Sequence, residues 1–263
     1  MTYDIYQVDA FTDTLFEGNP ACVVPLKKWL PTDVLLNIAK ENAVAETAFF
    51  IYDEDCFHLR WFTPDLEIDL CGHATLAAAH IIKTELKYNS NIKFKTISGN
   101  LHVKNNGNLY YLDLPSRPPI ISKLPKEIKL SLNIQPQKVY KSRDYLLLYK
   151  KQEEIENIII NRTTFDRINL GHGGVIVTAL GEEFDFVSRF FTPQATILED
   201  PVTGSAHCSL IPFWASILSK QKLIGSQLSK RGGTLYCENI KDRVIVGGKA
   251  ITYSKGIFSV KTN

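Results

Sequence analysis

The stretch "RWFTPDLEIDLCGHATLAAAH", from Arg60 to His80, has a near copy in "RFFTPQATILEDPVTGSAHCSL", from Arg189 to Leu210. Each copy contains Arg-x-Phe-Thr-Pro, a loop, a small turn centred on glycine, and a run that is largely apolar. The loop is longer in the second copy. Because the match continues in the same order through glycine, alanine and the apolar run, we interpret it as a duplication with pseudo-two-fold symmetry. The alternative is a chance match of a short motif.

Length and proline content indicate two halves. The chain has 263 residues, of which 44% are hydrophobic, enough for one large domain or two of about 130 residues each. Prolines cluster between residues 112 and 140, which indicates extended chain. We therefore expect an N-terminal half over residues 1–115 and a C-terminal half over residues 116–263, with the last strand free to pack on the N-terminal half.

Short runs rich in β-branched and aromatic residues, such as "TYDIYQVDAF" and "RVIVGGKAITY", predict strands along most of the chain. Helices are expected at 31–42, 74–86, 206–218 and near 152–162. The second and third of these are apolar nearly all round, as in a buried helix. Pro212 is expected to kink the third or to mark a short first turn. The predicted class is α+β, with barrel-like or sandwich-like sheets.

The charge distribution, the apolar runs and the cysteine spacing argue against a protein that binds nucleic acid or membranes and favour a reducing compartment. The formal net charge is +2, and basic and acidic residues are mixed along the chain, unlike the clustered basic surface of a nucleic-acid-binding protein. No apolar run is long enough to cross a bilayer, and the first residues lack a signal-peptide pattern. The five cysteines include no C-x-x-C pair, which fits reduced thiols. We expect a cytoplasmic protein that binds neither nucleic acid nor membrane.

The two glycine-centred turns are candidate anion sites. A helix N-terminus has unpaired N–H groups and a partial positive charge, and glycine lets a ligand approach the backbone. Two such ends facing each other across a domain cleft would bind a carboxylate. His73 and Ser205 lie at the helix starts, and Asp200 lies shortly before Ser205. Ordinary alternatives are a helix cap for Ser205, capping or packing for His73, and a turn before proline for Asp200.

Glu46 is a candidate proton carrier. It lies in "NAVAETAFF", between an expected helix and an apolar strand. A carboxyl group there caps, pairs or faces a pocket, where it could shuttle a proton, or it is a strand-edge side chain facing water. The sequence has no G-x-S-x-G motif and no P-loop. Cys71 and His73 lack the paired partners of a zinc site, so no metal is expected.

Five segments in this order resemble the phenazine-biosynthesis PhzF-like isomerase family over nearly the whole chain: "QVDAFTDTLFEGNPACVV", "AETAFF", "LCGHATLA", "DPVTGSA" and "RGGTLYCENIKDRVIVGGKA". The resemblance implies the diaminopimelate epimerase-like fold. In that fold two similar domains each wrap a curved sheet around a central helix, with the active site in the cleft between them. The resemblance also implies a homodimer that uses no cofactor and no metal.

By the same resemblance, Glu46 matches the general acid/base of the family. The residues that match its substrate-binding positions are Gly72, His73, Asp200, Gly204 and Ser205. The implied reaction is an allylic isomerisation of a small carboxylate-bearing metabolite. One side chain removes a proton from one carbon and delivers it to another. The backbone amides of the helix starts would stabilise the developing anion.

The chain departs from the sister families of epimerases and racemases at one position. Those enzymes use two cysteines, one from each domain. Here Cys71 occupies the first turn, but Thr203 occupies the matching place in the second. A threonine hydroxyl is far too weak an acid to replace a thiolate. An amino-acid epimerase or racemase is therefore disfavoured but stays an alternative, as does a non-catalytic protein that binds small acids.

Overall fold

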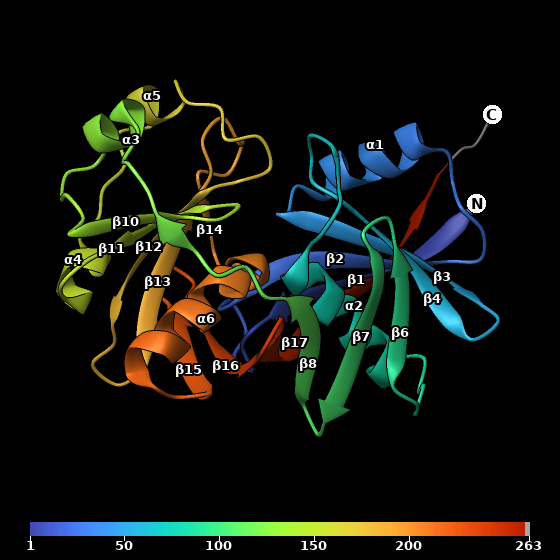
Figure 1. Ribbon diagram of the computed structural model, residues 1–263. Helices are drawn as coiled ribbons and strands as arrows, with labels where there is room; N and C mark the ends of the chain where they lie inside the picture. Colours follow the sequence, from blue (N-terminus) through green and yellow to red (C-terminus); the bar gives the residue numbers. More distant parts are fainter. Residues whose placement is uncertain (261–263) are drawn as a thin grey trace. The chain divides into compact units, whose positions relative to one another are not determined.

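The computed structural model describes residues 1–260 and divides into two compact units (Figure 1). The first unit comprises Met1–Asp113 and the described residues from Gly247 onward, and the second comprises Leu114–Val246. The long strand β17 (Arg243–Ser259) begins in the second unit and continues in the first. Both units combine many strands with few helices, so the expected α+β class is confirmed.

The first unit is a sheet that closes on itself around a helix. Its elements are β1 (Thr2–Ala10), β2 (Asn19–Leu26), α1 (Thr32–Asn42), β3 (Glu46–Asp53), β4 (Cys56–Phe62), β5 (Glu67–Ile68), α2 (Gly72–Thr84), β6 (Ile92–Thr96), β7 (Gly99–Asn106) and β8 (Leu109–Pro115). Neighbouring strands run in the order β17-β1-β2-β3-β4-β6-β7-β8, and β8 pairs in turn with β17. Helix α2 packs against β1, β2 and β3 and is buried from Gly72 to Ile82. This burial on all sides explains its apolar sequence.

The second unit has a similar plan. Its elements are β9 (Ile120–Ile121), α3 (Lys126–Ser131), β10 (Lys138–Lys141), β11 (Tyr145–Leu148), α4 (Gln152–Glu156), α5 (Arg162–Phe165), β12 (Val175–Leu180), β13 (Phe186–Phe191), β14 (Glu199–Asp200), the 3₁₀ turn η1 (Gly204–Ala206), α6 (His207–Leu218), β15 (Lys222–Gln227) and β16 (Gly233–Ile240). Helix α6 packs on β15 and β16. Its Trp214 stacks on Phe186 of β13, with ring centroids 6.0 Å apart, and donates from Nε1 to Thr178 Oγ1 at 3.0 Å.

Strand pairing confirms the duplication. In the first unit the pairs β2–β3, β3–β4, β4–β6 and β6–β7 are parallel, antiparallel, parallel and antiparallel. In the second unit β11–β12, β12–β13, β13–β15 and β15–β16 follow the same sequence of directions. The central helix of each unit follows a two-residue strand, β5 or β14, that pairs with the strand before it. The two echoed sequence segments therefore build equivalent parts of two equivalent halves.

Helix α6 continues through Pro212, so the proline does not end it. A proline has no N–H to donate to the carbonyl group one turn earlier, which leaves the Cys208 oxygen without its helical partner. The backbone N–H of Arg117 donates to this oxygen instead, at 2.8 Å. A residue from the proline-rich segment thus supplies the hydrogen bond that the helix lacks.

The single helix expected near 152–162 is wrong. Two short helices, α4 and α5, occupy this region and are separated by residues 157–161. Ile160 forms an isolated β-bridge with Leu132, which holds the intervening chain extended. Asn161 then caps α5 by accepting the Thr164 N–H at 3.1 Å. A polar cap and a tertiary bridge override the helical pattern of the sequence.

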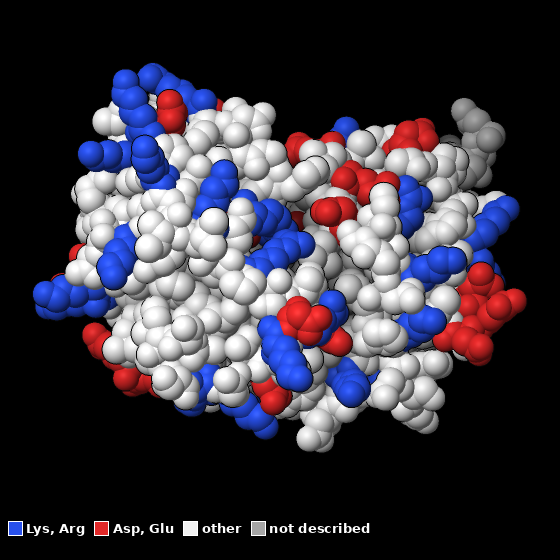
Figure 2. Space-filling view, viewed as in Figure 1, with Lys and Arg blue, Asp and Glu red and all other residues white. Residues whose placement is uncertain are grey.

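None of the helices within residues 1–260 is both long and apolar enough to cross a membrane. On the face drawn in Figure 2, basic and acidic side chains are interspersed among uncharged ones. The formal net charge of the whole chain is +2.

Candidate functional site

The chain enters β3 in a way that fixes Glu46. Helix α1 ends at Asn42, and Ala43 turns the chain with a left-handed φ of 51°. Asn42 Nδ2 then donates to Thr47 Oγ1 at 3.0 Å. Strand β3 lies parallel to β2 with Glu46 opposite Ala21, and Phe49 is fully buried further along it. The pairing with β2 and the hydrogen bond from Asn42 thus place Glu46 at the start of the strand, with 16% of its side chain exposed.

Helix α2 positions His73 and Cys71. Cys71 has an extended backbone just before the helix, and no side chain caps it with a hydrogen bond. The hydroxyl group of Thr75 donates to the Cys71 carbonyl oxygen and steadies the first turn. In this turn the amides of Gly72 and His73 have no acceptor within the helix, since the first N–H groups of a helix point outward. His73 and Cys71 are both buried.

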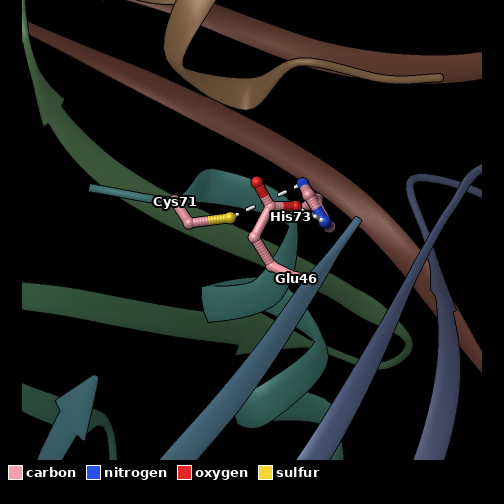
Figure 3. Close-up of side chains that lie close together, drawn as sticks. All are labelled: Glu46, Cys71 and His73. Atoms are coloured by element: carbon pink, nitrogen blue, oxygen red, sulfur yellow. Dashed lines mark hydrogen bonds and ion pairs between the residues drawn. The ribbon is translucent and has the colours of Figure 1, made fainter. Parts of the chain in front are cut away.

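Glu46, His73 and Cys71 form one cluster in the first unit (Figure 3). His73 Nε2 lies 2.9 Å from Glu46 Oε2, and Cys71 Sγ lies 3.6 Å from His73 Nδ1. The approach of Nε2 to Oε2 lacks hydrogen-bond geometry, so among the described residues both buried atoms are without a hydrogen bond. Such contacts often become aligned only when a substrate binds. The strand therefore brings its carboxyl group to the histidine of the helix, as a proton-transfer site requires.

Burial and charge act on the protonation of this cluster. Burial raises the pKa of the Cys71 thiol, and the Glu46 carboxylate raises it further, so the thiol stays protonated. Burial works against the charged form of His73. The contacts with Cys71 and with the Glu46 carboxylate outweigh this effect and raise the pKa of His73. Because Cys71 remains an uncharged thiol, the Glu46 carboxylate is the negative charge that stabilises a positively charged His73.

The cluster is a poor fit for a metal ion. Its three potential ligand atoms lie within 4.8 Å of one another. However, Cys71 Sγ approaches Nδ1 of the imidazole, whereas Glu46 Oε2 approaches Nε2. An ion bound to one ring nitrogen lies on the outer side of that nitrogen, so these two groups would not share it. The donor set therefore suits proton transfer better than metal binding.

In the second unit, Asp200 and Thr203 are joined by one glutamine. Thr203 Oγ1 donates to Asp200 Oδ2 at 2.5 Å. Gln227 accepts the Thr203 N–H at 2.8 Å and donates from Nε2 to the Asp200 carbonyl at 2.7 Å. Gln227 is 1% exposed, so the turn before η1 is held by a side chain that is itself packed in place.

Gly204 and Ser205 begin η1, and an arginine lies beside them. Arg143 Nη2 donates to Ser205 Oγ at 3.0 Å. Asp144, which is 1% exposed, holds the guanidinium group through contacts of 3.1 and 3.2 Å and also accepts the Gly174 N–H. A guanidinium group, a hydroxyl group and a helix start at one place favour an anion there.

The helix starts of the two units share one further contact. His207 Nδ1 lies 2.9 Å from the Thr203 carbonyl oxygen, just as the Thr75 hydroxyl donates to the carbonyl of Cys71. His207 is fully buried, and burial lowers its pKa to about 4, so the ring is neutral and Nδ1 carries the proton. It serves here to hold the turn.

The structure thus brings Glu46 to the turn of Gly72 and His73 in the first unit. It places Asp200, Gly204 and Ser205 together in the second unit. The expectation that both groups share one cleft stays a prediction. Sequence reasoning missed Asn19, whose Nδ2 lies 3.1 Å from His73 Nδ1, and Arg143. The motif "GNP" at residues 18–20 was the available signal for Asn19, whereas nothing in the sequence marks Arg143.

Nearly the whole chain is similar to known proteins. Residues 8–256 match the family described as phenazine biosynthesis-like protein. An uncharacterized isomerase of Pseudomonas aeruginosa is 43% identical over 97% of this chain and 98% of its own. A crystal structure of a phenazine biosynthesis protein of the PhzF family from Enterococcus faecalis has a TM-score of 0.94 and 43% identity. It covers 99% of this chain and 100% of that chain.

A more distant structure extends the likeness of the fold. The structure of a predicted epimerase from Pseudomonas aeruginosa has a TM-score of 0.75 over 98% of this chain and 100% of that one. Its sequence identity is 17%, so this likeness concerns the fold alone. The expected diaminopimelate epimerase-like fold is confirmed by these comparisons.

Proposed function

The chain belongs to the phenazine biosynthesis-like family, and from this premise we propose that it is an isomerase of small carboxylate-bearing metabolites. Glu46 acts as the general acid/base that takes a proton from one carbon and returns it to another. The reaction uses no cofactor. The observation that carries the proposal is the contact between the Glu46 carboxyl group and His73 at the start of a buried helix.

The parts of this site suit that chemistry. Glu46 must be charged and neutral in turn, and the adjacent imidazole can steady it in both states. The first-turn amides of Gly72 and His73 can donate hydrogen bonds to a developing negative charge without rearranging. In the second unit, Ser205 beside Arg143 favours the binding of a carboxylate. In this proposal Asp200, Gly204 and Ser205 hold the substrate.

An epimerase that uses two thiols is the second candidate, because Cys71 lies 3.6 Å from His73. Two observations count against it. The Cys71 thiol has a raised pKa, so little thiolate is present. The equivalent residue, Thr203, directs its hydroxyl group to Asp200 rather than acting as a second thiol. We therefore place the isomerase first.

The test is exchange with solvent deuterium. A panel of small enoic acids and amino acids is incubated with the protein in D₂O, and incorporation is read by mass spectrometry. Glu46→Gln should lower incorporation by about 10²- to 10⁴-fold, the usual effect of a general acid/base. Glu41→Gln is the matched control, since Glu41 is exposed on α1, and it should exchange like the wild type. Undiminished exchange in the Glu46 variant would remove Glu46 from the mechanism.

A further inference from the structure

The motif "GNP" at residues 18–20 places an asparagine beside the histidine of the candidate site. Gly18 has a φ of +66°, and a Cβ atom there would lie 2.3 Å from the Ala10 carbonyl oxygen. Only glycine fits this bend. Asn19 follows as the first residue of β2, paired with Ala10 in β1, and its side chain has no exposed surface. The bend and the pairing together direct Asn19 into the interior.

Asn19 meets His73 at the ring nitrogen that faces away from Glu46. Its Nδ2 lies 3.1 Å from His73 Nδ1, while His73 Nε2 lies 2.9 Å from Glu46 Oε2. An amide nitrogen only donates, so Nδ1 must accept. In a neutral imidazole the remaining proton then belongs to Nε2. We infer that Asn19 is a positioning residue that, in the neutral form of His73, leaves Nδ1 without a proton and directs the N–H of Nε2 to Glu46.

Cys71 supports the same assignment independently. Its Sγ lies 3.6 Å from the same Nδ1, and its buried thiol keeps its proton, so it is a second potential donor to that nitrogen. A ring with a proton on Nδ1 would direct an N–H at the Asn19 amide donor, with only the weakly accepting sulfur of Cys71 beside it. The Asn19 amide therefore disfavours a proton on Nδ1, and so opposes the imidazolium that Cys71 and the Glu46 carboxylate favour.

The consequence for the reaction rests on the proposed function. When substrate binding aligns this contact, the N–H of Nε2 holds Glu46 Oε2 in one direction and leaves the other carboxyl oxygen for the proton that moves. It also stabilises the carboxylate as it forms. Without Asn19, the ring could turn over or change tautomer, and Glu46 would lose this support in a fraction of the molecules.

The experiment reads the tautomer directly and needs no substrate. The full chain with ¹⁵N-labelled histidine is examined by NMR as the Glu46→Gln variant. In this variant the Glu46 charge that favours the imidazolium is gone, and burial favours the neutral ring. A glutamine side chain can donate or accept, so it does not dictate the tautomer. We expect His73 Nδ1 to resonate as an unprotonated nitrogen and Nε2 as a protonated one.

A second substitution, made in the Glu46→Gln protein, reverses the hydrogen bond between residue 19 and His73. Asn19→Asp gives Nδ1 an acceptor instead of a donor, so the proton should move to Nδ1. Adding Asn161→Ala, which removes one helix cap in the second unit, should leave the His73 spectrum unchanged. A protonated Nδ1 in the Glu46→Gln protein would overturn the inference. If the Asn19→Asp protein fails to fold, the spectrum of the Glu46→Gln protein still tests the inferred tautomer of His73.

Activity gives a readout that depends on both proposals. In the otherwise wild-type protein, Asn19→Ala should lower kcat for deuterium exchange about ten-fold with little change in KM, as expected for one lost hydrogen bond behind the acid/base. An equal fall in the Asn161→Ala control would show a merely structural effect and contradict the positioning role. Exchange that survives Glu46→Gln would refute the proposed function, whereas the tautomer measurement would stand by itself.

Discussion

Arg60 and Glu67 form a two-pronged ion pair in the first unit, with Nε to Oε1 and Nη2 to Oε2 each at 2.7 Å. Arg189 and Glu199 form the same pair in the second unit, at 2.6 and 2.9 Å. Each arginine also lies over the phenylalanine two residues later, at 5.1 and 5.0 Å from the ring centre. The repeated Arg-x-Phe motif therefore ties the strand that ends just before Thr-Pro to the short strand before the central helix.

The two arginines differ in their further hydrogen bonds and in their exposure to solvent. Arg189 Nη1 also donates to the carbonyl oxygens of Ile155 and Ile158 at 3.0 Å, and its side chain is 13% exposed. Arg60 is 24% exposed and makes one further hydrogen bond, to Thr32. We predict that Arg189→Ala lowers the free energy of unfolding by about 3 kcal/mol and Arg60→Ala by about 1 kcal/mol. Urea unfolding monitored by fluorescence measures both, and equal losses would contradict the prediction.

Gly18 offers a test of the bend that positions Asn19. Alanine at Gly18 would combine a strained φ with a clash against a backbone oxygen, so we predict a loss of more than about 2 kcal/mol in the free energy of unfolding. Gly107 is the matched control, because its φ is +61° and nothing lies within 4 Å of a Cβ there. Gly107→Ala should cost only about 1 kcal/mol. Thermal or urea unfolding separates the two, and similar losses would mean that the clash relaxes.

The sequence predicted the fold through features that are local and repeated. The helices α2 and α6 were predictable because a helix buried on all sides must be apolar on all sides. The helix near 152–162 was wrong because its pattern is short and polar, and a bridge from Leu132 to Ile160 decides its conformation. The 17-residue length of β17 was also hidden, since the glycine and serine residues within it resemble turns.

The candidate site was predictable only where its residues lie in motifs. Glu46 and His73 stand in distinctive surroundings, and the structure places them in contact. Asn19 is 54 residues from His73, and its contact depends on the pairing of β1 with β2. Arg143 is 62 residues from Ser205 and follows no pattern. Such contacts depend on tertiary packing, which a single sequence does not reveal.

Cys71 separates the two enzymatic interpretations. If Glu46 carries the proton in both directions, Cys71→Ser should retain deuterium exchange within a factor of about three, since the thiol only contacts His73. The native thiol should also resist alkylation at neutral pH, because burial and the Glu46 carboxylate raise its pKa. Exchange and alkylation are both followed by mass spectrometry. Loss of exchange in the serine variant would favour an epimerase with Cys71 as a base.

His207 should make stability depend on pH. Its pKa is about 4 in the folded protein, because of burial, against 6.5 for an ordinary histidine. Between these values the unfolded chain binds a proton that the folded chain does not. The contribution of His207 to the free energy of unfolding is therefore fully present above about pH 6.5. It falls by about 3 kcal/mol as the pH is lowered towards 4. His80, whose pKa burial also lowers to about 4, adds a loss in the same range.

The measurement compares slopes rather than absolute stabilities, since His207→Asn also removes packing against Phe186. Urea unfolding at several values between pH 7 and pH 4 should show a shallower fall in the free energy of unfolding for His207→Asn than for the wild type. His172→Asn is the control, because His172 is exposed, and its slope should equal that of the wild type. An unchanged slope in the His207 variant would mean that His207 takes up its proton at the same pH in the folded and the unfolded chain, and would contradict the prediction.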